Sequence, residues 1–150
     1  MYDSQFEPKP LLPALEPLYR RVVPLSWLLI RCSAGVILFV HGYPKLGHVA
    51  AVVGSMNRIR IVPAVPFAYL VILIETVGAV CVTIGFFTRL FAAACAIELA
   101  VLTFDVFWPN GFGWSHRGYE YMLMWGVVMF AIALRGGGPY SVDRLIGRAL

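Results

Sequence analysis

The residues of this chain that can do chemistry are charged or titratable side chains set within or beside long apolar segments. Five of them carry a guanidinium, imidazole, ammonium or carboxylate group: Arg31, His41, Lys45, Glu75 and Glu120. A charge at the centre of a bilayer costs at least ~2.5 kcal/mol on insertion scales and needs a polar partner. Two carboxylates beside a histidine and a lysine have the groups to relay protons or to bind a polar headgroup. We therefore treat these five residues as a candidate polar site within a membrane.

Arg31 needs a partner, and the spacing of the carboxylates favours one. Counting ~1.5 Å of rise per residue from the ends of the expected helices places Arg31 and Glu98 in the same half of the bundle. The same count places Glu75, Glu120, His41 and Lys45 in the other half. Because the arginine side chain is long, Arg31 also reaches towards Glu75, so its partner stays open. Such a pair can hold a bundle in register without any activity, so we expect Arg31 and Glu98 to form a structural ion pair.

An aromatic loop after the third apolar segment permits two interpretations. Trp and Tyr gather at membrane interfaces whatever a protein does. Alternatively, Trp108, Trp114, His116 and Arg117 form the mouth of a quinone or lipid site. The three histidines of the chain lack the close spacing of metal ligands, so we expect no metal site. The three cysteines are single and lie in apolar runs, which indicates small buried side chains.

The composition excludes most soluble classes of protein. The chain has 150 residues, of which 60% are hydrophobic and 13% are charged, and its mean hydropathy is +0.79. Soluble domains carry roughly 25% charged residues. The net charge of +4 does not indicate nucleic-acid binding, because the basic residues flank apolar segments and form no stripe. We expect an integral membrane protein with the lipid bilayer as its surroundings.

Four apolar segments must position the candidate residues. They cover about 25–40, 66–87, 90–107 and 119–134, and the more polar stretch 45–64 is expected to lie flat as a short amphipathic helix. The expected fold is all-α, an integral membrane four-helix bundle with that amphipathic segment between spans one and two. A proline-rich segment, 1–24, precedes the membrane domain, 25–135, because repeated proline disfavours a long helix. A basic tail, 136–150, follows it.

The charge pattern around the spans predicts an orientation. The first residues lack the basic region of a secretory signal, so we expect the first span to remain in the mature protein. Four spans place both termini on one side of the membrane. Arginines are in excess on that side, which favours cytoplasmic termini in a bacterial-type inner membrane. They are Arg20, Arg21, Arg89, Arg135, Arg144 and Arg148.

Several short motifs recur in an order and spacing that identify a family. The segment Arg31–Gly35 is followed by His41-Gly42-Tyr43-Pro44-Lys45-Leu46, then Glu75–Gly78 by Gly85–Arg89, and finally Glu120 by Gly136–Asp143. Together these motifs resemble the DoxX family of small four-helix membrane proteins over about residues 25–145. The resemblance places the five candidate residues at the polar positions of the family pattern, whereas Glu98 lies outside that pattern.

The resemblance implies a role in redox biology. Members are discussed as membrane subunits of redox systems, among them the membrane part of a thiosulfate:quinone oxidoreductase, partners in thiol and oxidative-stress complexes, and factors in methylamine dehydrogenase maturation. We therefore expect a membrane subunit of an oxidoreductase system that binds quinone or relays protons for a partner redox protein. The chain has no flavin motif, CxxCH or Fe–S cysteine spacing, so no covalently bound cofactor is expected and a partner must supply electrons.

Two alternatives remain open at the level of sequence. The first is a non-catalytic membrane anchor or assembly subunit of a larger complex, with the proline-rich start and the basic tail as docking elements. The second is a small transporter with the charged cluster as its site. Four short helices are few for alternating access, so a transporter would require a homo-oligomer. The sequence names neither the substrate nor the partner.

Overall fold

A computed structural model describes residues 12–147, and within that range the chain is helical with no β-strand. The α-helices are α1 (Glu16–Gly42), α2 (Val49–Arg58), α3 (Ala64–Leu73), α4 (Ala79–Ile84), α5 (Thr88–Val101), α6 (Glu120–Arg135) and α7 (Val142–Leu145). Short 3-10 helices are η2 (Pro13–Leu15), η3 (Tyr43–Gly47), η6 (Trp108–Asn110) and η7 (Trp114–His116). Two π-helices, η4 (Ile74–Gly78) and η5 (Leu102–Phe107), interrupt longer helices.

Three helical segments are long and apolar enough to cross a membrane: Pro13–Gly47, Ala64–Ile84 and Thr88–Asn110. The second is continuous through α3, η4 and α4, and the third through α5, η5 and η6. The fourth helix, α6, has 16 residues, which is about 24 Å at 1.5 Å per residue. The expectation of an all-α membrane protein is confirmed, and α2 is the short helix expected between spans one and two.

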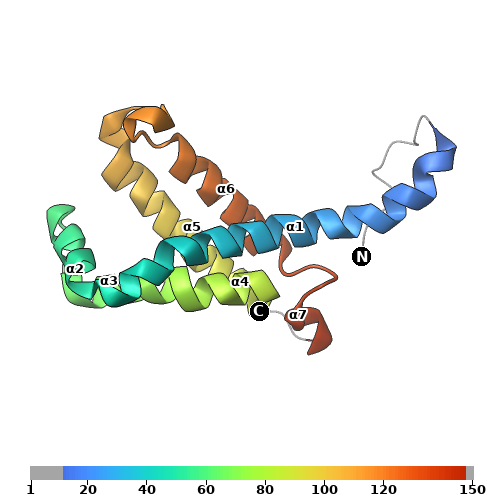
Figure 1. Cartoon of the computed structure of the whole chain (residues 1–150), viewed down its shortest axis with the longest axis horizontal. Helices are drawn as coiled ribbons and strands as arrows, with labels where there is room; N and C mark the ends of the chain where they lie inside the picture. Colours follow the sequence, from blue (N-terminus) through green and yellow to red (C-terminus); the bar gives the residue numbers. More distant parts are fainter. Residues whose placement is uncertain (1–11, 148–150) are drawn as a thin grey trace.

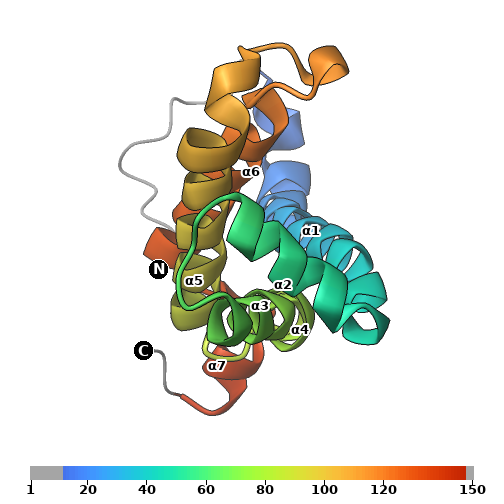
Figure 2. The same ribbon diagram turned by 90° about the vertical axis from the view of Figure 1, so that its left-hand side faces the viewer.

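The helices pair in two layers. In Figure 1, α1 runs alongside α4 and the π-helix η4 before it, and the pair α5 and α6 rises at a steep angle to them. Figure 2 shows α2 lying over α3, between α1 and α5. Small residues permit the close approach of α1 to α4, since a Cβ on Gly35 would lie 2.7 Å from the carbonyl oxygen of Ala79. Close packing through small side chains is the usual basis of helix association in lipid.

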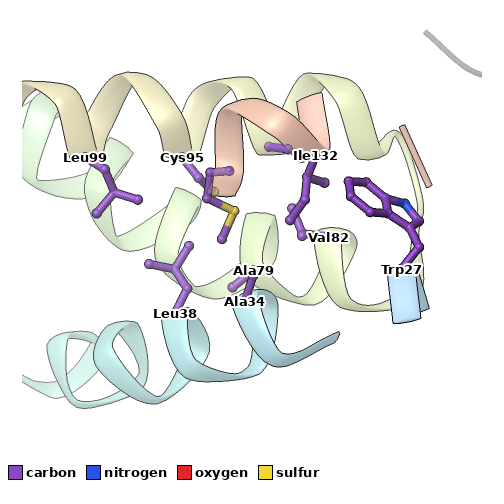
Figure 3. Close-up of a cluster of buried hydrophobic side chains, with 10 residues drawn as sticks. Trp27, Ala34, Leu38, Ala79, Val82, Cys95, Leu99 and Ile132 are labelled. Atoms are coloured by element: carbon purple, nitrogen blue, oxygen red, sulfur yellow. The ribbon is translucent and has the colours of Figure 1, made fainter. Parts of the chain in front are cut away.

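The buried core joins all four long helices. Trp27, Ala34 and Leu38 follow the i, i+7, i+11 spacing of one helical face and meet side chains of the other three helices (Figure 3). Those side chains are Ala79, Val82, Ala92, Cys95, Leu99, Met129 and Ile132. A second, separate cluster packs Val52 and Met56 of α2 against α3. The helix α2 is therefore held to the bundle by a few apolar contacts on one side.

Two expected boundaries are wrong. The helix α1 begins at Glu16, so the expected proline-rich lead-in is helical over its last part. Pro17 lies in the first turn, where no backbone N–H is needed, and Pro24 lies inside the helix. The second span ends at Ile84 and not at residue 87, because Gly85 has a left-handed φ of 76° that ends the helix. The start of the proline-rich segment, residues 1–11, lies outside the described residues.

The segment after α6 is not a free tail. It folds back on the end of the bundle, where the indole Nε1 of Trp27 donates a hydrogen bond of 3.0 Å to the Gly136 carbonyl. The Asp143 carboxylate accepts from the backbone N–H of Phe87 at 2.7 Å and of Thr88 at 3.0 Å, and from the Thr88 hydroxyl at 2.6 Å. Asp143 thereby supplies from a distant part of the chain the cap that the first turn of α5 lacks.

Candidate functional site

Arg31 is buried, and backbone carbonyls accept hydrogen bonds from two of its three side-chain nitrogens. Its Nη1 donates to the Val82 carbonyl at 3.2 Å and its Nη2 to the Tyr140 carbonyl at 2.5 Å. The side chain is 1% exposed and lies against Gly85. Arg31 thus connects α1, α4 and the folded-back C-terminal segment. The expected ion pair with Glu98 is wrong, and so is the alternative contact with Glu75.

The register of the helices explains why. Gly42 of α1 packs against the backbone of Glu75, whereas Arg31 packs beside Gly85. Arg31 lies eleven residues before Gly42, which separates it from the level of Glu75 by about 16 Å. Glu75 lies about 14 Å from the end of α4 at Ile84, and Glu98 about 15 Å from the start of α5, so the two glutamates share one depth. The sequence-based depths were counted from residues 87 and 90, whereas the helices end at Ile84 and begin at Thr88. That difference placed the two glutamates at different depths.

Lys45 and Glu75 form a partly buried ion pair. Lys45 Nζ lies 2.5 Å from Glu75 Oε1 and also contacts Oε2. The Glu75 side chain is 5% exposed and that of Lys45 is 33% exposed. Glu75 belongs to the π-helix η4, a local distortion that is frequent at functional sites. Two of the five candidate residues are therefore brought together as expected.

Glu98 of α5 is the third member of this group. Both of its carboxylate oxygens are buried, and neither has a hydrogen-bond partner among residues 12–147. It lies close enough to Glu75 and Lys45 to interact with both charges. A buried carboxyl group without a partner is costly and calls for an explanation. Sequence reasoning identified Glu98 but assigned it to the wrong half of the bundle.

A large cavity opens beside Glu98. Its volume is about 660 Å³, and it lies between α2, α3, α5 and η5. Its wall is almost entirely apolar, and the polar residues in it are Lys45, His48, Ser55 and Glu98. Figure 2 shows the position of α2 over this region. The site, called here the α2 cavity, therefore combines an apolar interior with a few polar groups in its wall.

The other two candidate residues lie elsewhere. His41 is exposed in the last turn of α1. Glu120 lies at the start of α6, where its Oε2 accepts a hydrogen bond of 3.2 Å from the backbone N–H of Trp114. Glu120 therefore holds the preceding loop and does not join Glu75. The structure does not assemble the five candidate residues into one cluster.

The aromatic loop forms its own packed unit. Trp108 stacks on Tyr119 with ring centroids 4.4 Å apart. Trp114, His116 and Arg117 are exposed. These three residues and Trp108, the four expected mouth residues, do not line the α2 cavity, although Phe107 just before them does. Over the described range, no group of three His, Cys, Asp or Glu side chains is arranged to hold a metal ion.

Comparison with known proteins gives one match. A family model described as DoxX matches residues 26–108, more than half of the chain. That range contains Arg31, Lys45, Glu75 and Glu98, and it covers every residue of the α2 cavity wall. No curated protein and no solved structure matches the chain.

Proposed function

The chain belongs to the DoxX family, and on that premise we propose that it is the membrane subunit of an oxidoreductase system and binds a quinone in the α2 cavity. A bound quinone would supply the redox chemistry, by taking up electrons and protons. The chain's own part is to hold the quinone at a defined depth and to exclude water around it. The reductant is a partner protein, because the sequence carries no electron-carrying motif.

The observation that supports this proposal most is the α2 cavity with Glu98 in its wall. A volume of about 660 Å³ falls within the roughly 300–1,000 Å³ typical of small-molecule sites. The apolar wall suits a hydrocarbon tail, and the polar groups in it are few, as in sites that fix the orientation of a ligand. Lys45, His48 and Glu98 are the residues placed to meet a quinone headgroup.

A second candidate function, a membrane anchor for a partner enzyme, rests on the shape of α1. No residue of α1 before Trp27 is buried, and in Figure 1 this part of the helix extends past the ends of α4 and α6. It measures about 16 Å from Glu16 to Trp27. A projecting helix that carries Arg20 and Arg21 is a docking element for a protein at the membrane surface. The anchor and the quinone-binding roles are compatible.

Arginines at the same end of the molecule indicate how the protein is oriented in the membrane. Arg89, Arg135 and Arg144 lie at the end of the bundle where α4 and α6 end. Arg20 and Arg21 lie on the part of α1 that projects beyond this end. By the positive-inside rule this end faces the cytoplasm, in a bacterial-type inner membrane. Arg148 lies outside the described residues. The partner enzyme would then be cytoplasmic and would dock at this end.

The first test is purification in native lipid discs, followed by mass spectrometry of everything bound. We expect a quinone and a redox partner to copurify. A partner without quinone would favour the anchor, and a protein with neither would contradict both proposals and favour a transporter.

A pair of variants locates the quinone. Ala51→Trp fills the α2 cavity, because Ala51 lines it, whereas Ala50→Trp adds the same bulk on the next residue, outside the cavity wall. Both alanines are exposed on α2, so neither change disturbs buried packing. The A51W variant should lose the bound quinone and the A50W variant should retain it. Equal retention by both variants would exclude the α2 cavity as the site.

A further inference from the structure

Glu98 stands apart from the other buried polar groups of the bundle. Four side-chain atoms in the described residues are buried without a hydrogen-bond partner: Arg31 Nε, Glu75 Oε2 and both oxygens of Glu98. Arg31 is held by other bonds at the far end of the bundle. Glu75 Oε2 lacks a geometrically good hydrogen bond, but it contacts the Lys45 ammonium group, so its charge is compensated. Neither oxygen of Glu98 has a hydrogen-bond donor or a contacting cation, and the Glu75 carboxylate lies within hydrogen-bonding reach only when one of the two glutamates carries a proton.

The nearest cation is already engaged. Lys45 Nζ contacts both oxygens of Glu75, and together the two side chains carry no net charge. A third, ionised carboxyl group would leave the trio with a net negative charge inside an apolar wall. The trio is neutral when Glu98 carries a proton. In that form it has one O–H to donate and one carbonyl oxygen to accept.

Because Glu98 lies in the wall of the α2 cavity, a ligand in that cavity is a candidate hydrogen-bond partner for it. Glu98 lines the α2 cavity together with Ile97 and Val101 of α5 and with apolar residues of α2 and α3. Lys45 and His48, which also line it, come from the connection that leads into α2. With an apolar occupant, the Glu98 carboxyl group has only the Glu75 carboxylate, which already binds Lys45, as a hydrogen-bond partner. An occupant with an oxygen in its head would offer it a second partner.

From this arrangement we propose that Glu98 is the specificity-determining contact of the α2 cavity, hydrogen-bonding to a carbonyl oxygen in the head of a bilayer-dissolved ligand whose apolar tail lies under α2. The inference rests on the proposed function, since a quinone is a ligand of this class. It adds a ligand-binding residue that the family pattern does not contain. It also predicts which ligands the α2 cavity selects. Ligands with the same tail but no oxygen in the head gain nothing from Glu98.

The test compares two variants with two probes, using the full chain in lipid discs. The variants are Glu98→Gln, which keeps a donor and an acceptor, and Glu98→Leu, which has neither. The probes are a benzoquinone with a short alkyl tail and an alkylbenzene with the same tail. We expect the E98L variant to bind the benzoquinone about tenfold more weakly than the wild type, and the E98Q variant to stay within about threefold. Both variants should bind the alkylbenzene as the wild type does.

The outcomes separate this inference from the proposed function. If wild type and E98L bind the benzoquinone equally, Glu98 is satisfied within the protein, for instance by sharing a proton with Glu75, and the inference is wrong while the quinone site stands. If the wild type binds no benzoquinone, the proposed function itself fails. Glu120→Gln serves as the control, because that carboxylate lies at the start of α6 against the aromatic loop and outside the α2 cavity wall, so its loss should change neither affinity. Thermal unfolding of each variant checks that the bundle is intact.

Discussion

Lys45 and Glu75 lie 30 residues apart in the chain, and their side chains meet with Lys45 Nζ 2.5 Å from Glu75 Oε1. The contact joins η3, which follows α1, to the π-helix η4 in the middle of the second span. Gly42 makes it possible, since any Cβ there would collide with the backbone of Glu75. The ion pair and the close helix contact therefore form one structural unit beside the α2 cavity.

Glu75→Gln removes one charge of this unit and should destabilise the bundle. The loss removes the carboxylate that contacts the Lys45 ammonium group. Breaking a buried ion pair in this way costs about 3–5 kcal/mol. We expect a value near the lower end of that range, because the Lys45 side chain is 33% exposed. Thermal unfolding in detergent measures it, with Asp105→Asn on an exposed position as the control. Equal stability of both variants would show that the pair contributes little.

Gly42→Ala tests the close approach of α1 to η4. The new methyl group would lie 2.5 Å from the carbonyl oxygen of Glu75, and backbone atoms have little freedom to move. Overpacking of this kind costs about 1–3 kcal/mol or more. Gly54→Ala in α2 is the matched control, because nothing lies within 4 Å of its Cβ position. Alanine should there stabilise the helix slightly, by up to about 1 kcal/mol. Similar unfolding temperatures for the two variants would contradict the packing described here.

Asp143→Ala should release the C-terminal segment from the bundle. The carboxylate accepts two backbone N–H bonds at the start of α5 and one from the Thr88 hydroxyl. Hydrogen bonds to a charged group contribute about 1.5–3 kcal/mol each, so the loss should be detectable as faster proteolysis after Gly136. Arg144→Ala, on the exposed side of α7, should leave the cleavage rate unchanged. Equal protection of both variants would mean that other contacts hold the segment.

A double-mutant cycle tests the separation of Arg31 from Glu98. Residues about 16 Å apart along the bundle, with no shared partner, should be energetically independent. The variants Arg31→Met and Glu98→Gln should therefore show a coupling energy below about 0.5 kcal/mol. The same cycle on Lys45→Met and Glu75→Gln should give a larger value, up to about 3 kcal/mol. A large coupling energy between Arg31 and Glu98 would contradict their separation and support the ion pair expected from sequence.

Labelling of single cysteines tests the proposed orientation. In a background without native cysteines, Ser115→Cys lies in the aromatic loop and Arg144→Cys at the opposite end of the bundle, and both positions are exposed. A membrane-impermeant maleimide added to intact cells should label position 115 alone. Labelling at position 144 instead would place the arginine-rich end outside.

Much of the fold could be predicted from the sequence. Long apolar runs determine that helices cross a membrane, because every backbone polar group in lipid must be satisfied within its own segment. The lower hydropathy of the stretch 45–64 predicts a short helix that does not cross the membrane, and α2 lies within that stretch. The start of α1 was missed because Pro17 and Pro24 suggested a break, whereas both lie within the helix in the structure.

The candidate site was predicted only in part. Lys45 and Glu75 were expected near one another, and they form an ion pair. Glu98 was placed in the other half of the bundle for two reasons. The count to Glu75 began at Phe87, three residues or about 4.5 Å beyond the end of α4, and the count to Glu98 began at Leu90, two residues or about 3 Å after the start of α5. The signal that could have corrected it is Gly85, a residue suited to the left-handed turn that ends a helix.

By itself, then, the sequence determined that this protein is a helical membrane protein of the DoxX family and which polar residues lie within its spans. Apolar length and local spacing are properties of one segment at a time, so they can be read along the chain. Only the tertiary structure decided that Arg31 contacts backbone carbonyls, that Glu98 joins Lys45 and Glu75, and that a cavity opens under α2. Those relationships depend on the register between helices. A turn and a few close glycine contacts set that register, and no single segment encodes it.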